Sequence, residues 1–455
     1  SDYMSTNQDI NELDKQVIGT TFRARNYPMT MAKASGSTIW DERGRKYIDF
    51  MASACVANTG HCHPKVVKAI KDQFNNLTTA TAICIPNKPT LLLAKRLIEL
   101  TPGDFEKKVW FGSSGSDACD AIYDFVPIAK KKRKIISFYG SHHGLTVGTN
   151  FLSGHKISSK YLQSPSVVKV PYPYCYRCPF QDIDNNVEDV NTQCCNHSVK
   201  FIEEHVFQNI CPPEDTAGII LEPIASLAGE VVPPFQFIKD IKRICDKYDI
   251  FLISDEVKAG FGRTGKMFAI EHSGVIPDAI TLGKPMASGF PLSAIIARKE
   301  IVDSEHVSHA TSGAGHPAGS AACLATLDVI QEEKLMDNAT KQGNYLRDNL
   351  NKLKNEHEMI GDGRGIGLMN GVEIVKDRKT KEPAPTEALK VCYGAWKRGL
   401  LFITVGTHSN VFEITPPLII TREEIDKGLE IMNDAFTDVE TGKISDSDIS
   451  ESAAL

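Results

Sequence analysis

A lysine that follows a short apolar run has the sequence setting for covalent chemistry. Residues 280–282 read as a buried strand, and Gly283 lets the backbone turn before Lys284. In a tight, weakly hydrated pocket the ammonium group of Lys284 would lose hydration, so its pKa would fall and it would become a nucleophilic amine that can form a Schiff base. Most lysines are solvated surface charges, so this interpretation depends on the rest of the chain.

Three other groups follow strand-like runs. Residues 112–120 open a helix, and their glycines and serines favour a phosphate at its amino terminus, although a well-capped helix would look the same. Residues 139–144 carry Tyr and His side chains that could lie flat on a ring. Asp255 ends a third run, where an aspartate can hold a cationic ring nitrogen. Together with Lys284, these are the four groups that a pyridoxal 5'-phosphate (PLP) cofactor requires.

The elements around these groups indicate an α/β fold. Between residues 88 and 300, helical stretches alternate with apolar runs, which predicts a mainly parallel sheet with helices on both faces. Ligands bind such sheets beyond the carboxyl ends of the strands, where the four groups occur. The predicted strands are residues 108–111, 134–138, 218–221, 250–254 and 279–282.

The remaining segments predict smaller units. Residues 37–49 read as a hairpin, a helix starts near His63, and residues 366–374 and 410–418 read as strands of a second, smaller sheet. We expect an arm and part of the small domain in residues 1–60, a large PLP-binding domain in 61–320, a small domain in 321–436 and a mobile acidic tail in 437–455.

Composition excludes several classes of protein. The chain has 455 residues, of which 42% are hydrophobic and 24% charged, and its net charge is -6, which is typical of a globular protein and not of one that binds nucleic acid. It contains neither a membrane-length apolar run nor a secretory signal, so the cytoplasm is the expected location.

Most cysteines read as small buried side chains, among them Cys84, Cys211, Cys245, Cys323 and Cys392. The exceptions, Cys175, Cys178, Cys194 and Cys195, form either a thiol-rich loop or a metal or disulfide site.

From about residue 25 to 435, the sequence resembles the class-III aminotransferases of fold type I. The motifs that carry the resemblance are Gly115-Ser116-Asp117-Ala118, Asp255-Glu256-Val257 with Gly262-Arg263-Thr264-Gly265, Gly283-Lys284 with Pro291-Leu292-Ser293, and Gly367-Leu368-Met369 with Glu373. The resemblance implies a large domain with a mainly parallel seven-stranded sheet, a smaller α/β domain, a PLP cofactor, and a homodimer with shared active sites that acts on a small-molecule amino donor and acceptor.

The resemblance also assigns roles to residues. Lys284 would be the Schiff-base lysine and Asp255 the partner of the pyridine nitrogen. His142 stands where the family usually has an aromatic residue stacked on the ring. Ser312, or Thr311 beside it, stands near the place of a threonine that reaches the neighbouring subunit's phosphate. The remaining cofactor-binding residues would be Ser114, Gly115, Ser116, Glu222 and Lys258.

Two departures from the family bear on the substrate. Glu413 replaces an arginine that binds a carboxylate in many class-III enzymes, and would repel an acidic group and attract a cationic one. The alternative for Glu413 is a salt bridge on a strand edge. Lys258 replaces the usual glutamine near the cofactor's phenolic oxygen. Because the carboxylate-binding arginine is absent, L-glutamate, the family's common donor, would need another residue such as Arg263 or Lys258 to bind its carboxylate.

Lys258 and Glu413 also occur in alpha-amino-epsilon-caprolactam racemase, which the sequence resembles. That enzyme has a tryptophan at the position of Ala54 and an acid/base aspartate at the position of Leu227. Because racemisation needs a second proton carrier, we predict transamination, with racemisation of amino acids, amino-acid amides or aminocaprolactam as the alternative. Ala54 leaves room for a bulky substrate, and with Glu413 it indicates a cationic one such as an aminosugar of aminoglycoside biosynthesis.

Overall fold

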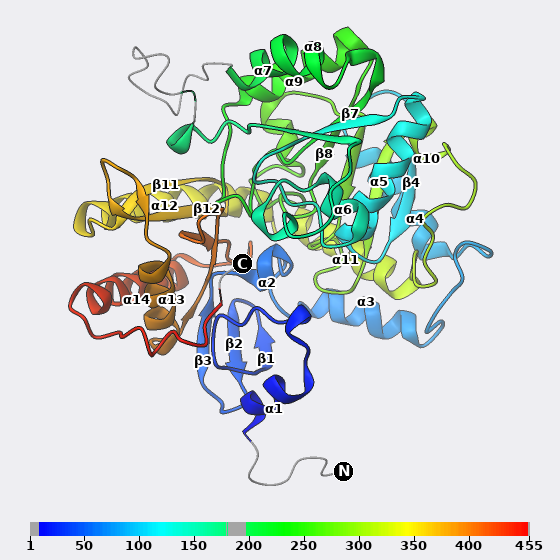
Figure 1. Cartoon of the computed structure of the whole chain (residues 1–455). Helices are drawn as coiled ribbons and strands as arrows, with labels where there is room; N and C mark the ends of the chain where they lie inside the picture. The colour runs from blue at the N-terminus through cyan, green and yellow to red at the C-terminus, as the bar shows by residue number, and fades with distance from the viewer. Residues whose placement is uncertain (1–8, 179, 181–196, 454–455) are drawn as a thin grey trace.

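The computed structural model describes residues 9–178, 180 and 197–453 (Figure 1). Its largest layer is a seven-stranded sheet in the order β4-β10-β9-β8-β7-β5-β6. β10 is antiparallel to both of its neighbours, whereas the pairs from β9 to β6 are parallel. The strands are β4 (Lys107–Gly112), β5 (Lys134–Phe138), β6 (Val167–Val170), β7 (Thr216–Leu221), β8 (Phe251–Asp255), β9 (Ala279–Leu282) and β10 (Ser293–Arg298). The predicted α/β fold with a mainly parallel sheet is therefore confirmed.

Helices bury both faces of this sheet, which explains why β7, β8 and β9 consist entirely of buried residues. On one face Ile122 of α5 packs in a cluster with Ile253, and on the other Phe237 of α9 packs in a cluster with Phe138. The helices of this part are α3 (Pro64–Phe74), α4 (Lys88–Leu100), α5 (Gly115–Lys130), α6 (Val147–Leu152), α7 (His197–Phe201), α8 (Phe207–Asn209), α9 (Phe235–Tyr248), α10 (Lys299–Val302) and α11 (Pro317–Glu332).

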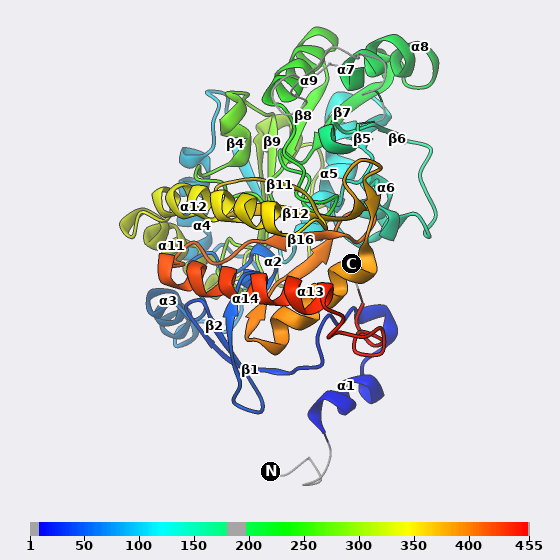
Figure 2. The ribbon, with the colours of Figure 1, turned by 90° about the vertical axis from the view of Figure 1, so that its left-hand side faces the viewer.

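A second sheet lies in the C-terminal part, with long helices packed against it (Figure 2). Its order is β11-β12-β16-β15, with β13 paired to β12. The predicted strand 366–374 straddles two strands, because β11 ends at Ile366 and the chain turns through Gly367 into β12. The elements are α12 (Leu335–Glu356), β11 (Ile360–Ile366), β12 (Met369–Asp377), β13 (Glu382–Pro383), α13 (Pro385–Lys397), β15 (Ile403–Val405), β16 (Val411–Ile414) and α14 (Arg422–Glu440).

The N-terminal segment joins the C-terminal part through a third sheet. The predicted hairpin is present as β2 and β3, and β14 from the far end of the chain pairs in parallel with β3. The elements are α1 (Ile10–Val17), β1 (Met31–Ser35), β2 (Thr38–Asp41), β3 (Lys46–Asp49), α2 (Ala52–Cys55) and β14 (Leu400–Leu401).

Residues of the predicted tail pack against the N-terminal arm. The Ala453 N–H donates to the Arg25 carbonyl oxygen at 2.9 Å, and Lys15 pairs with Glu451 at 2.8 Å. Ile444 is buried and lies next to Gly394 of α13. A few apolar side chains and backbone hydrogen bonds thus hold this segment against the rest of the chain, and its mobility stays a prediction.

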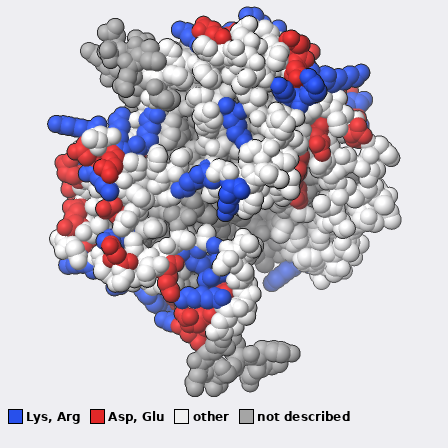
Figure 3. All heavy atoms as spheres, viewed as in Figure 1, with Lys and Arg blue, Asp and Glu red and all other residues white. Residues whose placement is uncertain are grey.

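Along the described ranges, no helix is both long and apolar enough to cross a membrane. Figure 3 shows basic and acidic side chains interspersed over one face of the molecule.

α2 is a turn of left-handed helix. Four consecutive non-glycine residues, Ala52 to Cys55, have φ between 49° and 67°. The Asp49 carboxylate holds this turn by accepting the N–H groups of Met51 and Ala52 at 2.8 and 2.9 Å. Left-handed backbone costs about 1–2 kcal/mol per non-glycine residue. We infer that this cost is tolerated because the turn places Ala54 in the wall of the main pocket.

Ser53 offers a test of this strain, because its side chain is exposed while its backbone has φ 52°. Ser53→Gly is expected to raise the free energy of unfolding by about 0.5–1 kcal/mol, since glycine adopts this conformation without a steric cost. Ser53→Ala keeps the strain and should leave stability unchanged. Denaturant unfolding of the holoenzyme measures both variants, and equal midpoints for them would contradict the assignment of strain.

Candidate active site

A cavity of about 430 Å³ opens beyond the carboxyl ends of β7, β8 and β9. The structure brings most of the predicted site residues to its wall: Ala54, Ser114, Gly115, Ser116, His142, Glu222, Leu227, Asp255, Lys258 and Lys284. The predicted residues Thr311, Ser312 and Glu413 are not part of this wall.

Lys284 extends into the cavity from the turn after β9. Within the described residues its amino group has neither an ion pair nor a hydrogen bond, whereas Lys258 is paired with Glu413. Burial among the surrounding residues, followed by the charge of Lys258, lowers the pKa of Lys284 below its usual value. A neutral, nucleophilic amine is therefore easier to form here than on the surface.

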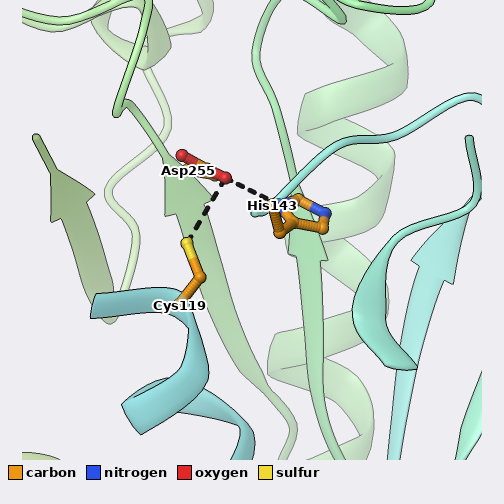
Figure 4. Close-up of side chains that lie close together, drawn as sticks. All are labelled: Cys119, His143 and Asp255. Atoms are coloured by element: carbon orange, nitrogen blue, oxygen red, sulfur yellow. Dashed lines mark hydrogen bonds and ion pairs between the residues drawn. The ribbon is translucent and has the colours of Figure 1, made fainter. Parts of the chain in front are cut away.

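Asp255, at the end of β8, is held in place from several sides (Figure 4). His143 Nδ1 lies 2.6 Å from Oδ2, and the thiol of Cys119 lies 3.5 Å from the same oxygen. The Val257 N–H and the Thr281 hydroxyl donate to Oδ1 at 3.0 and 3.2 Å. Burial alone would lower the pKa of His143, but its bond to the Asp255 carboxylate raises that pKa above the usual value. Asp255 thus presents an oriented negative charge to the cavity.

His143 and Cys119 were missed by the sequence analysis. The adjacent His142-His143 pair was the available signal, but spacing alone does not tell which ring faces the acid. Their ligand-type atoms and that of Asp255 lie within 4.8 Å of one another. Since these groups hydrogen-bond to one another, we interpret them as support for the carboxylate and not as a metal site.

The four cysteines considered for a metal or disulfide cannot be compared as a set, because Cys194 and Cys195 lie outside the described residues. Of the cysteines predicted to be buried, Cys84 is exposed, since its apolar neighbours also lie at the surface.

The amino terminus of α5 faces the cavity with Ser114 as its N-cap. The Ser114 hydroxyl accepts the Asp117 N–H at 3.1 Å, which leaves the N–H groups of Gly115 and Ser116 in the first turn without helical acceptors. A Cβ at Gly115 would lie 2.4 Å from Val257, so glycine lets the helix start directly beside the end of β8. Such a helix terminus binds phosphate.

His142 and Glu222 form another part of the wall. The His142 N–H donates to Glu222 at 2.9 Å. Burial, together with the charges of His143 and Lys284, lowers the pKa of His142 to about 3, so its ring is neutral. Burial raises the pKa of Glu222 to about 7. A neutral, flat imidazole is suited to stacking on an aromatic cofactor.

These groups fit PLP. The N-terminus of α5 offers the anion site, and Asp255 offers the carboxylate for a protonated ring nitrogen. His142 has a buried Nδ1 with no partner among the described residues, and Lys284 supplies an unpaired amine.

The pairing of Lys258 with Glu413 corrects the prediction that Glu413 contacts a cationic substrate. Glu413 is fully buried in β16, and its carboxylate forms a close ion pair with Lys258. The structure thus agrees with the salt-bridge alternative, although β16 lies between β12 and β15 and not at a sheet edge. Neither charge of this pair is free for a substrate.

Arg263 is also unavailable to a donor carboxylate. It is fully buried, and its guanidinium donates to Asn58 Oδ1 at 2.7 Å and to the Leu368 carbonyl oxygen at 3.0 Å. Its role is to join the two parts of the chain.

Part of the cavity wall is apolar, and we call the space beside it the apolar chamber. Its wall includes Ala54, Ile157, Leu227, Ile403 and Val405, and no arginine lines the cavity within the described part of the chain. Such a wall favours an apolar substituent.

Comparison with known proteins agrees with this geometry. Residues 21–436 match the family model described as Aminotransferase class-III. The chain is 41% identical over 442 residues to a leucine/methionine racemase of Thermococcus litoralis, covering 96% of this chain and 97% of that protein. It is 33% identical to a 5-aminovalerate aminotransferase of Pseudomonas aeruginosa, covering 91% and 94%. An amine transaminase from an uncultivated Pseudomonas species, solved in a PLP-bound form, superposes with a TM-score of 0.82 at 27% identity, covering 90% of this chain and 94% of that one. The chain therefore belongs to the class-III aminotransferases, PLP-dependent enzymes of fold type I.

Proposed function

We propose that this enzyme transfers an amino group between an apolar amine or amino acid and an apolar aldehyde or ketone. The observation that carries the proposal is an unpaired Lys284 amine facing an apolar chamber. Leu227 lines the cavity at the position where alpha-amino-epsilon-caprolactam racemase, which the sequence resembles, carries an acid/base aspartate.

The side chains have separate tasks in this reaction. Bound PLP supplies an electron sink for the bond that is broken at the substrate. The N-terminus of α5 anchors the phosphate, and Asp255 keeps the ring nitrogen protonated. Lys284 takes the proton from the substrate's α-carbon and delivers it to the cofactor's C4' atom. Leu227 and its apolar neighbours exclude water from the reacting carbon.

The proposed substrate differs from the expected cationic aminosugar. That expectation depended on a Glu413 carboxylate facing the pocket, but this carboxylate is paired with Lys258 outside the cavity wall. L-Glutamate is not favoured as donor, since Arg263 is bonded within the protein and no arginine of the described residues lines the cavity.

Racemisation of an amino acid is the second candidate. It is favoured by 41% identity to the leucine/methionine racemase over 96% of the chain, together with a chamber suited to side chains of that kind.

A homodimer in the cytoplasm is part of the same proposal. Thr311 and Ser312 are exposed, as groups that reach a neighbouring subunit would be in a single chain. Ile83, Ile85, Leu91 and Leu92 add exposed apolar surface that a second copy could cover.

A donor panel read by absorbance tests the proposal. Apolar amines, leucine and methionine are expected to convert the bound cofactor to pyridoxamine phosphate, whereas an aminosugar and L-glutamate should convert it at least about tenfold more slowly. Leu227→Ala should slow an apolar donor about tenfold, because it removes contacts with the substrate. Faster conversion by the aminosugar would overturn the proposed substrate class.

A further inference from the structure

A group of four polar side chains extends from the cavity wall into the interior of the protein. Glu230 and Glu413 are both fully buried, and Lys258 Nζ is closely paired with Glu413 and lies 4.0 Å from Glu230. The Ser226 hydroxyl is hydrogen-bonded to Glu230 and lies 3.2 Å from Glu413 Oε1. We call Ser226, Glu230, Lys258 and Glu413 the Glu230 cluster.

The Glu230 cluster contains one more acid than base. Two carboxylates and one ammonium would leave an uncompensated negative charge away from water, which is costly, so one carboxyl group keeps its proton. The ion pair between Lys258 and Glu413 determines which of the two carboxyl groups keeps the proton. Burial raises the pKa of both acids, but the Lys258 ammonium lowers that of Glu413, whereas the charge of Glu413 raises that of Glu230 further. Glu230 is therefore the neutral acid.

Ser226 connects this proton to the cavity. A hydroxyl has one proton to donate and can also accept, so a protonated Glu230 can donate to Ser226 while Ser226 donates elsewhere. Ser226 lines the cavity, whereas Glu230 and Glu413 do not. Ser226 is thus the member of the Glu230 cluster that can pass the proton of Glu230 to a substrate in the cavity.

The sheet order places Ser226 and Lys284 on different sides of Asp255. Ser226 follows β7 and Lys284 follows β9, and both strands flank β8, which ends at Asp255. Lys284 and Ser226 therefore enter the cavity wall from strands on opposite sides of the strand that carries Asp255.

We propose that Ser226, supplied with a proton by Glu230, is a second acid of the active site and lets the enzyme invert the α-carbon of an apolar amino acid. Lys284 takes the α-proton and becomes an ammonium. The Ser226 hydroxyl proton moves to the opposite face of the α-carbon, and the Glu230 proton replaces it on Ser226. The proton of the Lys284 ammonium returns to Glu230 through water between turnovers, so one C–H bond breaks, one forms, and no oxidant is needed.

This proposal rests on the proposed function in one respect, which is that Lys284 removes the α-proton of the substrate.

The experiment incubates the holoenzyme with L-leucine or L-methionine in deuterated water without an oxo acid. Proton NMR measures α-deuteration, and chiral chromatography measures inversion. We expect the wild type to give both products. Ser226→Ala and Glu230→Gln should lower inversion at least about tenfold, while α-deuteration with retention stays within about threefold of wild type.

Two matched variants control for structural damage. Ser226→Thr keeps a hydroxyl and should retain inversion. Glu358→Gln changes an exposed glutamate outside the site and should leave both reactions unchanged. Thermal unfolding and cofactor absorbance show whether each variant is folded and loaded.

The pH profile separates a proton donor from a structural residue. Inversion in the wild type should fall as pH rises through the raised pKa of Glu230, because only its protonated form donates; Glu230→Gln should abolish this alkaline fall. The groups that bear on this titration are Lys258, Glu413, Cys55 and Arg263.

The outcomes distinguish the two proposals. If the wild type deuterates the α-carbon only with retention of configuration, or if folded Ser226→Ala inverts it as fast as the wild type, Ser226 is not the second acid. Either result would leave the role of Lys284 unaffected. The absence of α-deuteration with every apolar donor would overturn both proposals.

Discussion

Lys284→Ala is expected to lower amino transfer by at least about 10⁴-fold, since in the proposed mechanism this side chain provides both the covalent link to PLP and the proton carrier. Lys258 cannot substitute, because its ammonium is held by Glu413. The measurement is single-turnover conversion of the cofactor by the best apolar donor.

Two controls sharpen this test. Lys284→Arg keeps the positive charge but lacks a nucleophilic amine, and should be as inactive as Lys284→Ala. Lys68→Ala removes an exposed surface lysine and should leave the rate unchanged. Borohydride reduction followed by peptide mapping should find the phosphopyridoxyl label on Lys284 of the wild type. A label on another lysine would refute the assignment.

Asp255→Asn is expected to lower turnover by about 10²–10³-fold while PLP remains bound. An amide keeps the shape of the side chain but cannot neutralise a protonated ring nitrogen, so the electron sink weakens. Because the phosphate contacts at α5 and the amine of Lys284 are unchanged, the loss should fall mainly on kcat and not on cofactor content. Steady-state kinetics and the cofactor absorbance together measure this split.

His143 provides a graded comparison for Asp255. His143→Gln should lower turnover about tenfold, since it loosens the carboxylate without removing its charge. Asp446→Asn changes an exposed aspartate and should have no effect. If Asp255→Asn kept wild-type turnover, Asp255 would not be the partner of the ring nitrogen.

The substrate proposal shows where local sequence misleads. Glu413 stands where many class-III enzymes have an arginine, which by itself indicates a cation-binding group, but a sequence does not show which buried charges neutralise one another. Lys258 and Glu413 are 155 positions apart, and only folding brings them into contact. Two unusual residues that neutralise each other say little about the charge of the substrate.

The sequence by itself determined the fold class and the cofactor, and it placed Lys284 at the end of a buried strand. Buried strands leave continuous apolar runs, and the side chains just after them must lie at one edge of a parallel sheet, so local pattern was sufficient. The same reasoning placed Asp255 and the start of α5 correctly in the cavity wall.

Only the tertiary structure decided which groups support, neutralise or contact the site. His143 and Cys119 reach Asp255 from different segments, and Ser226 and Glu230 are joined to Lys258 across the fold. The packed C-terminal tail, the left-handed turn at Ala54 and the apolar chamber follow in the same way from long-range contacts. Such contacts depend on distances that sequence spacing does not contain. The fate of the α-proton therefore depends on the tertiary surroundings of Lys284.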